Sequence, residues 1–314
     1  MMYPKTRYQS TPPSSGKRGV ALPPFLVIAA PVTFAVALFF LTGGFGLWAH
    51  IDSRRDLETL WQYGDFRAVF QRAEALLEQT PMQAEPLVFA GLGHFYAGME
   101  QSDQELRSEH LDRAVVFLRK ALLVPNPPLE AEIHHVLGKT YFHRGPFFFE
   151  ASVSHIERAI GLGLVTDDSF EYLAVAYDGL NRFTESVESY TEAIRRNPND
   201  LLLVGLADVL IRHGHYDAAR EYLVRAISTS SDEYLIQGAR FQLGRAALET
   251  GRFEDAAREF ETILTVDPSV ADAHFELGRV YQRTDQPERA RFHWREAIRI
   301  EPRHAEALRS LRAN

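Results

Sequence analysis

Four histidines, His134, His135, His143 and His155, lie close together in the sequence and are the side chains best suited to bind a metal. Imidazole nitrogens are common transition-metal ligands, but a site needs several ligands that converge on one point. His135 and His143 could share one face of a helix, whereas we expect His134 to fill a packed core. Because the chain contains no cysteine, a thiolate site is excluded. We expect neither a metal nor a cofactor.

Gly138, Lys139 and Thr140 form the tripeptide that ends a phosphate-binding loop. Such a loop needs a further glycine five residues before Gly138, where this sequence has Ile133. The motifs Gly-x-Ser-x-Gly and His-Glu-x-x-His, which mark hydrolases and zinc proteases, are absent. The sequence therefore predicts no catalytic residue, and we expect that the protein is not an enzyme.

Charge is distributed unevenly along the 314 residues. Residues 1–49 contain four basic residues and no acidic one, whereas the 30 basic and 42 acidic residues of 50–314 give that part a net charge of −12. An acidic domain repels a phosphate backbone, which favours clustered Lys and Arg. We therefore expect no nucleic-acid partner.

A long uncharged segment precedes the acidic part of the chain. The 24 residues of Phe25–Trp48 read "FLVIAAPVTFAVALFFLTGGFGLW", and about 20 apolar helical residues are enough to span a bilayer. A cleaved signal peptide has a shorter apolar region followed by a site of small residues. The sequence therefore predicts an uncleaved transmembrane signal-anchor helix at 20–49, after a disordered basic tail at 1–19.

Basic residues on both sides of this segment bear on its orientation. Four precede it, which favours a cytoplasmic N-terminus and a large domain on the extracytoplasmic side. The protein would then be a single-pass protein of an inner or plasma membrane, with a periplasmic domain. Because Arg54 and Arg55 follow the segment, the reverse orientation, with a cytoplasmic domain, stays open.

The remainder of the chain repeats itself with a period of about 34 residues. One copy carries Leu277-Gly278, Tyr281, Ala290, Trp294, Ala297 and Pro302, and the copy before it carries Leu243-Gly244, Ala256, Phe260, Ile263 and Pro268. Further copies begin near residues 86, 131, 167 and 200, and residues 50–82 resemble a degenerate first copy. Small residues at these positions let two antiparallel helices approach, large residues fill the space between them, and the proline ends the second helix.

This pattern resembles the tetratricopeptide repeat family, over roughly residues 50–302. The resemblance implies an all-α fold, a right-handed superhelical solenoid of about six helix-turn-helix repeats over 50–314, preceded by the one transmembrane helix. The last residues, "RHAEALRSLRAN", have the composition of a short capping helix. In the copy from Pro86, nine extra residues, "MEQSDQELR", are expected to form a loop between the two helices.

In this family the first helices of the repeats line a concave groove. Carried over, the groove residues are Arg212, Phe241, Arg245, Leu248, Phe275, Arg279, Gln282 and Arg283. Arginine beside phenylalanine suits an extended peptide that is acidic or has a free carboxylate, since a guanidinium can hold a carboxylate with two hydrogen bonds. The alternative is that these arginines pair with neighbouring carboxylates such as Asp208 or Glu249.

Three phenylalanines, Phe147, Phe148 and Phe149, follow Gly145-Pro146. The resemblance places Gly145 at the turn between two helices, so that "PFFFEAS" begins the second one. Three successive helical residues span about 200° around the axis, more than one seam can bury. We expect two of them to pack, against the loop around 101–107 or an adjacent repeat, and the third to be a surface contact.

These features together predict a membrane-tethered scaffold or adaptor that binds protein partners in its concave groove, in an envelope-associated assembly. The alternative is an extracytoplasmic binding module for a small ligand or a cell-wall component.

Overall fold

The computed structural model describes residues 56–313, and within this range the chain is helical and contains no strand. The tail and anchor expected at 1–19 and 20–49 lie outside the described residues. Among the helices of 56–313, none combines the length and the apolar character that a membrane crossing requires.

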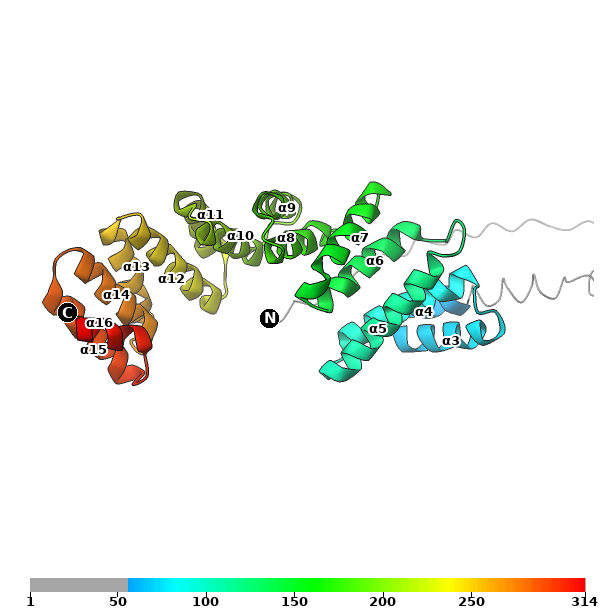
Figure 1. Cartoon of the computed structure of the whole chain (residues 1–314), viewed down its shortest axis with the longest axis horizontal. Coiled ribbons are helices and arrows are strands. Elements are labelled where there is room, and N and C mark those ends of the chain that lie inside the picture. The colour runs from blue at the N-terminus through cyan, green and yellow to red at the C-terminus, as the bar shows by residue number, and fades with distance from the viewer. Residues whose placement is uncertain (1–55, 314) are drawn as a thin grey trace, which may run out of the picture. The chain divides into compact units, whose positions relative to one another are not determined.

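The helices follow one another as antiparallel neighbours joined by short turns (Figure 1). Residues 56–63 form the first described helix. The others are α3 (Phe66–Gln79), α4 (Ala84–Glu100), α5 (Gln104–Ala121), α6 (Glu130–His143), the 3₁₀ helix η1 (Pro146–Phe148), α7 (Phe149–Gly161), α8 (Ser169–Gly179), α9 (Phe183–Arg196), α10 (Asp200–Arg212), α11 (Tyr216–Thr229), α12 (Glu233–Glu249), α13 (Phe253–Val266), α14 (Ala271–Arg283), α15 (Pro287–Ile300) and α16 (Ala305–Ala313).

Each helix packs on the next one in the chain, and the first helices of consecutive repeats also touch, as with α4 and α6 or α12 and α14. This is the arrangement of a helical solenoid, in which a repeat contacts its neighbours and buries its apolar face against them. The all-helical solenoid of helix-turn-helix repeats predicted from the sequence is confirmed for the described residues.

Glycines at the seams between paired helices make this packing possible. A Cβ atom on Gly278 would overlap the indole of Trp294, and one on Gly138 would overlap Ile156. Both of these large side chains are buried. The seams of α14 with α15 and of α6 with α7 therefore leave no space for a side chain at these two positions.

The nine residues 99–107, which we expected to form a loop, mostly lengthen two helices instead. The helix α4 has 17 residues and α5 has 18, and only residues 101–103 separate them. Asp103 explains where α5 begins, because its carboxylate accepts hydrogen bonds from the backbone N–H groups of Glu105 and Leu106. Such an N-cap satisfies donors that the first turn of a helix leaves unpaired.

One helix precedes α3 in the described residues, and α16 follows α15. In the first described helix, Leu57 is buried and the Trp61 ring makes edge contacts with Phe66 and Tyr96, at centroid distances of 5.3 and 5.4 Å. The helix α16 packs on α15 and buries Ala307. Both helices therefore contribute side chains to the core of the array.

Ion pairs join the first helices of consecutive repeats. One member of each pair is an arginine or lysine on a first helix, and the other is a carboxylate on, or at the start of, the neighbouring one. The pairs are Lys139–Asp168 at 2.7 Å, Arg212–Asp178 at 2.8 Å and Arg279–Glu249 at 2.9 Å.

Candidate partner-binding groove

An open groove of about 490 Å³ lies where α12, α14 and α16 meet. Its lining residues are Phe241, Arg245, Asp272, Phe275, Glu276, Arg279, His304 and Glu306. Four of the eight residues predicted for the groove, Phe241, Arg245, Phe275 and Arg279, are therefore brought together here. Phe241 and Phe275, like Arg245 and Arg279, are 34 residues apart, so successive repeats present them at equivalent positions.

Aromatic packing fixes the two phenylalanine rings while leaving each partly exposed. Phe241 meets Phe260 edge to face at 5.7 Å between centroids, and Phe275 lies 5.0 Å from the imidazole of His304. Both phenylalanines are half-buried, so one side of each ring rests on the core and the other is accessible. A rigid, partly exposed aromatic side chain loses little conformational entropy when a partner covers it.

The two groove arginines are engaged by carboxylates of the chain itself. The Arg279 guanidinium donates to Glu276 at 2.7 Å and to Glu249 at 2.9 Å, and Arg245 lies 3.6 Å from Glu276. Glu276 is only 6% exposed, and burial raises its pKa although both arginines act to lower it. The alternative of internal pairing, which the sequence left open, therefore describes Arg245 and Arg279.

Arg212 lies outside this groove. Its guanidinium donates to both oxygens of Asp178 at 2.8 Å and to Asp208 at 3.1 Å, and it thereby ties α10 to α8. The expected alternative partner Asp208 is thus one of its two carboxylates.

Leu248 was predicted to face the groove, and this prediction is wrong. Its side chain is 0% exposed and belongs to the core that contains Phe260 and Leu277. Residue 248 follows Gly244 by one helical turn, so it shares the face with which Gly244 packs on α13. Its position on that face, rather than on the groove, explains the burial.

Gln282 and Arg283 are exposed at the end of α14 but do not line the groove. The Arg283 guanidinium lies over the Phe253 ring, 5.7 Å from its centroid.

Four lining residues were missed from the sequence: Asp272, Glu276, His304 and Glu306. The last two come from the start of α16, which the sequence suggested only as a cap. A signal for them existed, because Ala305 and Leu311 stand 34 residues after Ala271 and Leu277. The helix α16 therefore occupies the position of the first helix of one more repeat.

Residues 149–234 and 241–294 match the family model described as tetratricopeptide repeat. The chain carries tetratricopeptide repeats over these residues. Its fold is similar to that of MamA from Desulfovibrio magneticus RS-1, with a TM-score of 0.50 and 16% identity over 56% of this chain and 98% of that one. A structure of YrrB, described as a TPR protein with an unusual peptide-binding site, gives a TM-score of 0.45 and 22% identity over 76% of this chain and 97% of that one.

Among curated proteins, lipopolysaccharide assembly protein B of Escherichia coli K12 is 23% identical over 172 residues. The match covers 54% of this tetratricopeptide repeat chain and 43% of the relative, so the chain spans less than half of that protein's length.

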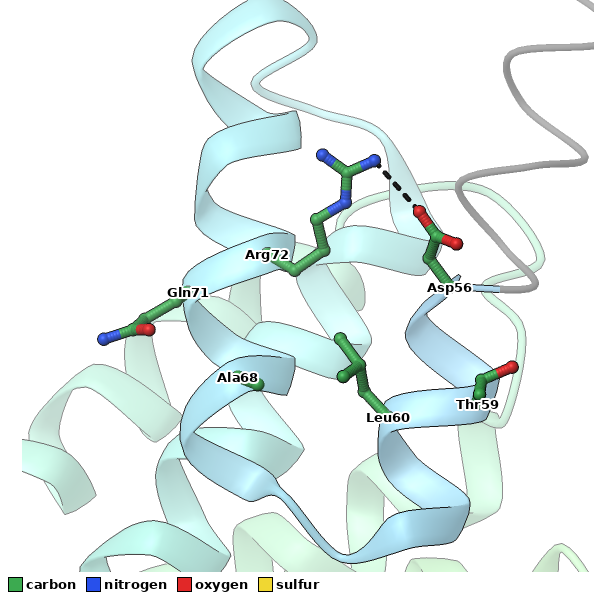
Figure 2. Close-up of a pocket in the computed structure, with 6 residues that line it drawn as sticks. All are labelled: Asp56, Thr59, Leu60, Ala68, Gln71 and Arg72. Carbon is green, nitrogen blue, oxygen red and sulfur yellow. Dashed lines mark hydrogen bonds and ion pairs between the residues drawn. The ribbon is translucent and has the colours of Figure 1, made fainter.

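A second hollow lies in the first of the tetratricopeptide repeats, between residues 56–63 and α3. Its volume is about 550 Å³, and it is lined by Asp56, Thr59, Leu60, Ala68, Gln71 and Arg72. Figure 2 shows Arg72 reaching across the gap to Asp56, at 3.2 Å, with Leu60 between the two helices. Since it lacks the paired aromatic rings of the C-terminal groove, we regard the C-terminal groove as the better candidate.

The four histidines that lie close together in the sequence do not converge on one point. His134 and His155 face each other with their Nδ1 atoms 2.9 Å apart, whereas Nε2 of His143 lies 3.0 Å from the Tyr172 hydroxyl. Burial lowers the pKa of His143 to about 4, and that of His155 to about 4 as well. Over the described residues, no three metal-ligating side chains gather at one point.

The three phenylalanines after Gly145 differ in burial, and one of them is left exposed, as we expected. Phe147 is 91% exposed, Phe148 is half-buried under the Arg144 guanidinium at 4.2 Å, and Phe149 is buried. Phe149 packs against the next tetratricopeptide repeat, where its ring occupies the space beside Gly179 of α8. The helix α7 starts at Phe149 rather than at Pro146, because residues 146–148 form the 3₁₀ turn. Phe147 is thus the exposed phenylalanine of the three, and its role as a surface contact for a partner stays a prediction.

Proposed function

We propose that this protein is a scaffold whose tetratricopeptide repeats bind a protein partner in the groove formed by α12, α14 and α16. The observation that carries the proposal is the pair Phe241 and Phe275, two half-buried rings presented at equivalent positions of successive repeats in one open groove. Partly exposed aromatic residues beside arginines are typical of the centres of protein interfaces. The charged groups are engaged by one another, which suits binding and not acid–base catalysis, so we propose no enzymatic activity.

We further propose that the scaffold is tethered to a membrane by residues 20–49 and serves an envelope-associated assembly. The uncharged segment Phe25–Trp48 supports the tether, and the name of the relative, lipopolysaccharide assembly protein B, supports the setting. In the proposed orientation the N-terminus is cytoplasmic and the repeats are extracytoplasmic. Protease protection of the full chain in spheroplasts tests this: digestion of the repeats from outside is expected, and their protection would require the reverse orientation.

The finer expectation of an acidic partner has less support than the groove itself. A carboxylate from a partner would have to displace Glu249 or Glu276 from Arg279, and Glu276 is buried. The proposal is therefore a protein partner, without an acidic preference.

Site-specific photo-crosslinking of the full chain in membranes tests the groove. A photoreactive amino acid at position 241 or 275 is expected to crosslink a discrete partner, whereas the same group at Phe292, which is 55% exposed on α15 outside the groove, is not. The double variant Phe241→Ala/Phe275→Ala should lose that partner, and Phe292→Ala should keep it. Equal crosslinking from position 292, or an unchanged partner in the double variant, would refute the proposal.

A further inference from the structure

The charges of the C-terminal groove specify what kind of partner segment it accepts. Among its lining residues, Arg245 and Arg279 oppose three carboxylates, those of Asp272, Glu276 and Glu306. Next to the groove, Glu249, which pairs with Arg279, adds a fourth carboxylate, and Arg309, which pairs with Glu306 at 3.1 Å, adds a third guanidinium. The guanidinium groups are neutralised within the chain, so the charge that remains available to a partner is negative.

The buried ring of His304 lies between two of these carboxylates. The backbone N–H of Ala307 donates to its Nδ1 atom at 3.3 Å, and Glu306 lies 3.6 Å from the same atom. Its other nitrogen, Nε2, donates to Asp272 Oδ1 at 3.1 Å and so orients that carboxylate.

Asp272 is placed to receive a cation. Its side chain is 71% exposed, and among the lysines, arginines and histidines of the described residues its one ion-pair partner is the imidazole of His304. Phe275 is three residues further along α14 and so lies on the same face of the helix. A positive side chain between them would meet the carboxylate and one face of the ring, which combines an ion pair with a cation–π contact.

We propose that the groove selects a partner segment that carries an arginine or lysine, and that Asp272 binds the positive side chain. This inference rests on the proposed function and replaces the acidic partner expected from the arginines alone. The net charge of −12 over residues 50–314 acts in the same direction, because it attracts basic segments at long range and more strongly at low salt.

The test is selection of peptides from a random phage-displayed library on the full chain in detergent. Peptides eluted from the unaltered chain are expected to be enriched several-fold in Arg and Lys over Asp and Glu, relative to the input. The variant Asp272→Asn keeps an oxygen that accepts the hydrogen bond from His304 but removes the charge, so the enrichment should disappear. The matched control is Asp285→Asn, an exposed carboxylate of the same repeat outside the groove, which should retain the enrichment.

Phe241→Ala/Phe275→Ala separates this inference from the proposed function. Selected peptides that depend on these two rings but show no basic bias, or a bias that Asp272→Asn leaves intact, overturn the inference and leave the groove as a partner site. Peptides enriched in Asp and Glu also overturn it. Failure to select any peptide that depends on Phe241 and Phe275 overturns both.

Discussion

Nδ1 of His274 lies 3.0 Å from Nδ1 of His293, so one imidazole donates a hydrogen bond to the other across the seam of α14 and α15. The arrangement recurs in two more seams, His134–His155 between α6 and α7 and His94–His110 between α4 and α5, each at 2.9 Å. A bond between two imidazoles requires a nitrogen without a proton on one of them. Protonation of both rings of a pair would therefore break it.

Acid should destabilise the fold between pH 6.5 and 4. Burial, and then the paired imidazole, lowers the pKa of His155 and of His293 to about 4. Because these values lie below the unfolded value of about 6.5, the unfolded chain binds more protons in this window, and stability is full above it and falls as pH drops. The limiting slope is about 1.4 kcal/mol per pH unit for each extra proton. The free energy of unfolding in urea, measured at pH 7, 5.5 and 4.5, gives this slope.

The variant His155→Gln/His293→Gln should show a shallower dependence than the unaltered chain. His215→Gln, at an exposed position, serves as the control and should not change the slope. Besides His274, the groups that face His293 are Arg289, Glu296 and the stacked ring of Tyr281. Those that face His155 are His134, Arg119 and the stacked ring of Tyr141. An unchanged slope in the double variant would assign the acid sensitivity to other groups.

Gly278→Ala should destabilise the protein, because the new methyl group would overlap the buried indole of Trp294. Forcing extra volume into a packed seam costs about 1–3 kcal/mol. The matched control is Gly238→Ala on α12, where nothing lies within 4 Å of the new Cβ and helix propensity should add about 0.5–1 kcal/mol of stability. Chemical denaturation measures the free energy of unfolding of both variants. Equal changes in this free energy would contradict the close approach of α14 and α15.

Arg279→Gln should destabilise the array, because Glu276 would remain buried with only the more distant Arg245 nearby. Hydrogen bonds to charged groups are worth about 1.5–3 kcal/mol. The control Arg283→Gln removes only the contact with the Phe253 ring, worth about 0.5–1 kcal/mol at an exposed site. In thermal unfolding, Arg279→Gln should therefore lower the midpoint more than Arg283→Gln does. A stable Arg279→Gln protein would show that its ion pairs contribute little.

Phe149 and Phe147 should have different roles, the first in the stability of the fold and the second in a surface contact. Phe149→Ala removes a buried ring from the seam with α8 and is expected to cost about 3–5 kcal/mol. Phe147→Ala removes an exposed ring and should change stability by less than about 0.5 kcal/mol. Denaturation midpoints test both values. If Phe147→Ala also leaves partner recovery from membranes intact, the surface-contact role predicted for this residue is wrong.

The repeat period predicted the helices and the equivalence of Phe241 with Phe275, because helix pairs of this kind need small and large residues at fixed intervals. The repeat period could not predict whether the groove arginines are paired with carboxylates of the chain. Arg279 pairs with Glu276, three residues away on the same helix, and with Glu249, which is 30 residues away in the chain and on another helix. The pairing with Glu249 follows from how repeats stack, and a single repeat does not contain that information.

Two further errors have local causes. The repeat frame placed Phe241 and Arg245 of α12 correctly in the groove, but Leu248 lies one turn after Gly244, on the face of α12 that packs on α13, and is therefore buried. At residues 99–107, the length of the insertion was read as a loop, although Asp103 is a preferred N-cap residue and marks a helix start.

The ion pairs between first helices limit how far the repeats are interchangeable. Repeat arrays are often treated as modules that can be deleted or exchanged, since each one contacts only its neighbours. Here one of the two carboxylates that pair with Arg279 comes from the repeat before it, and the carboxylate that pairs with Lys139 comes from the repeat after it. Removal of one repeat would leave a charge without its counterpart in the next, so the order of the repeats is part of what the sequence encodes.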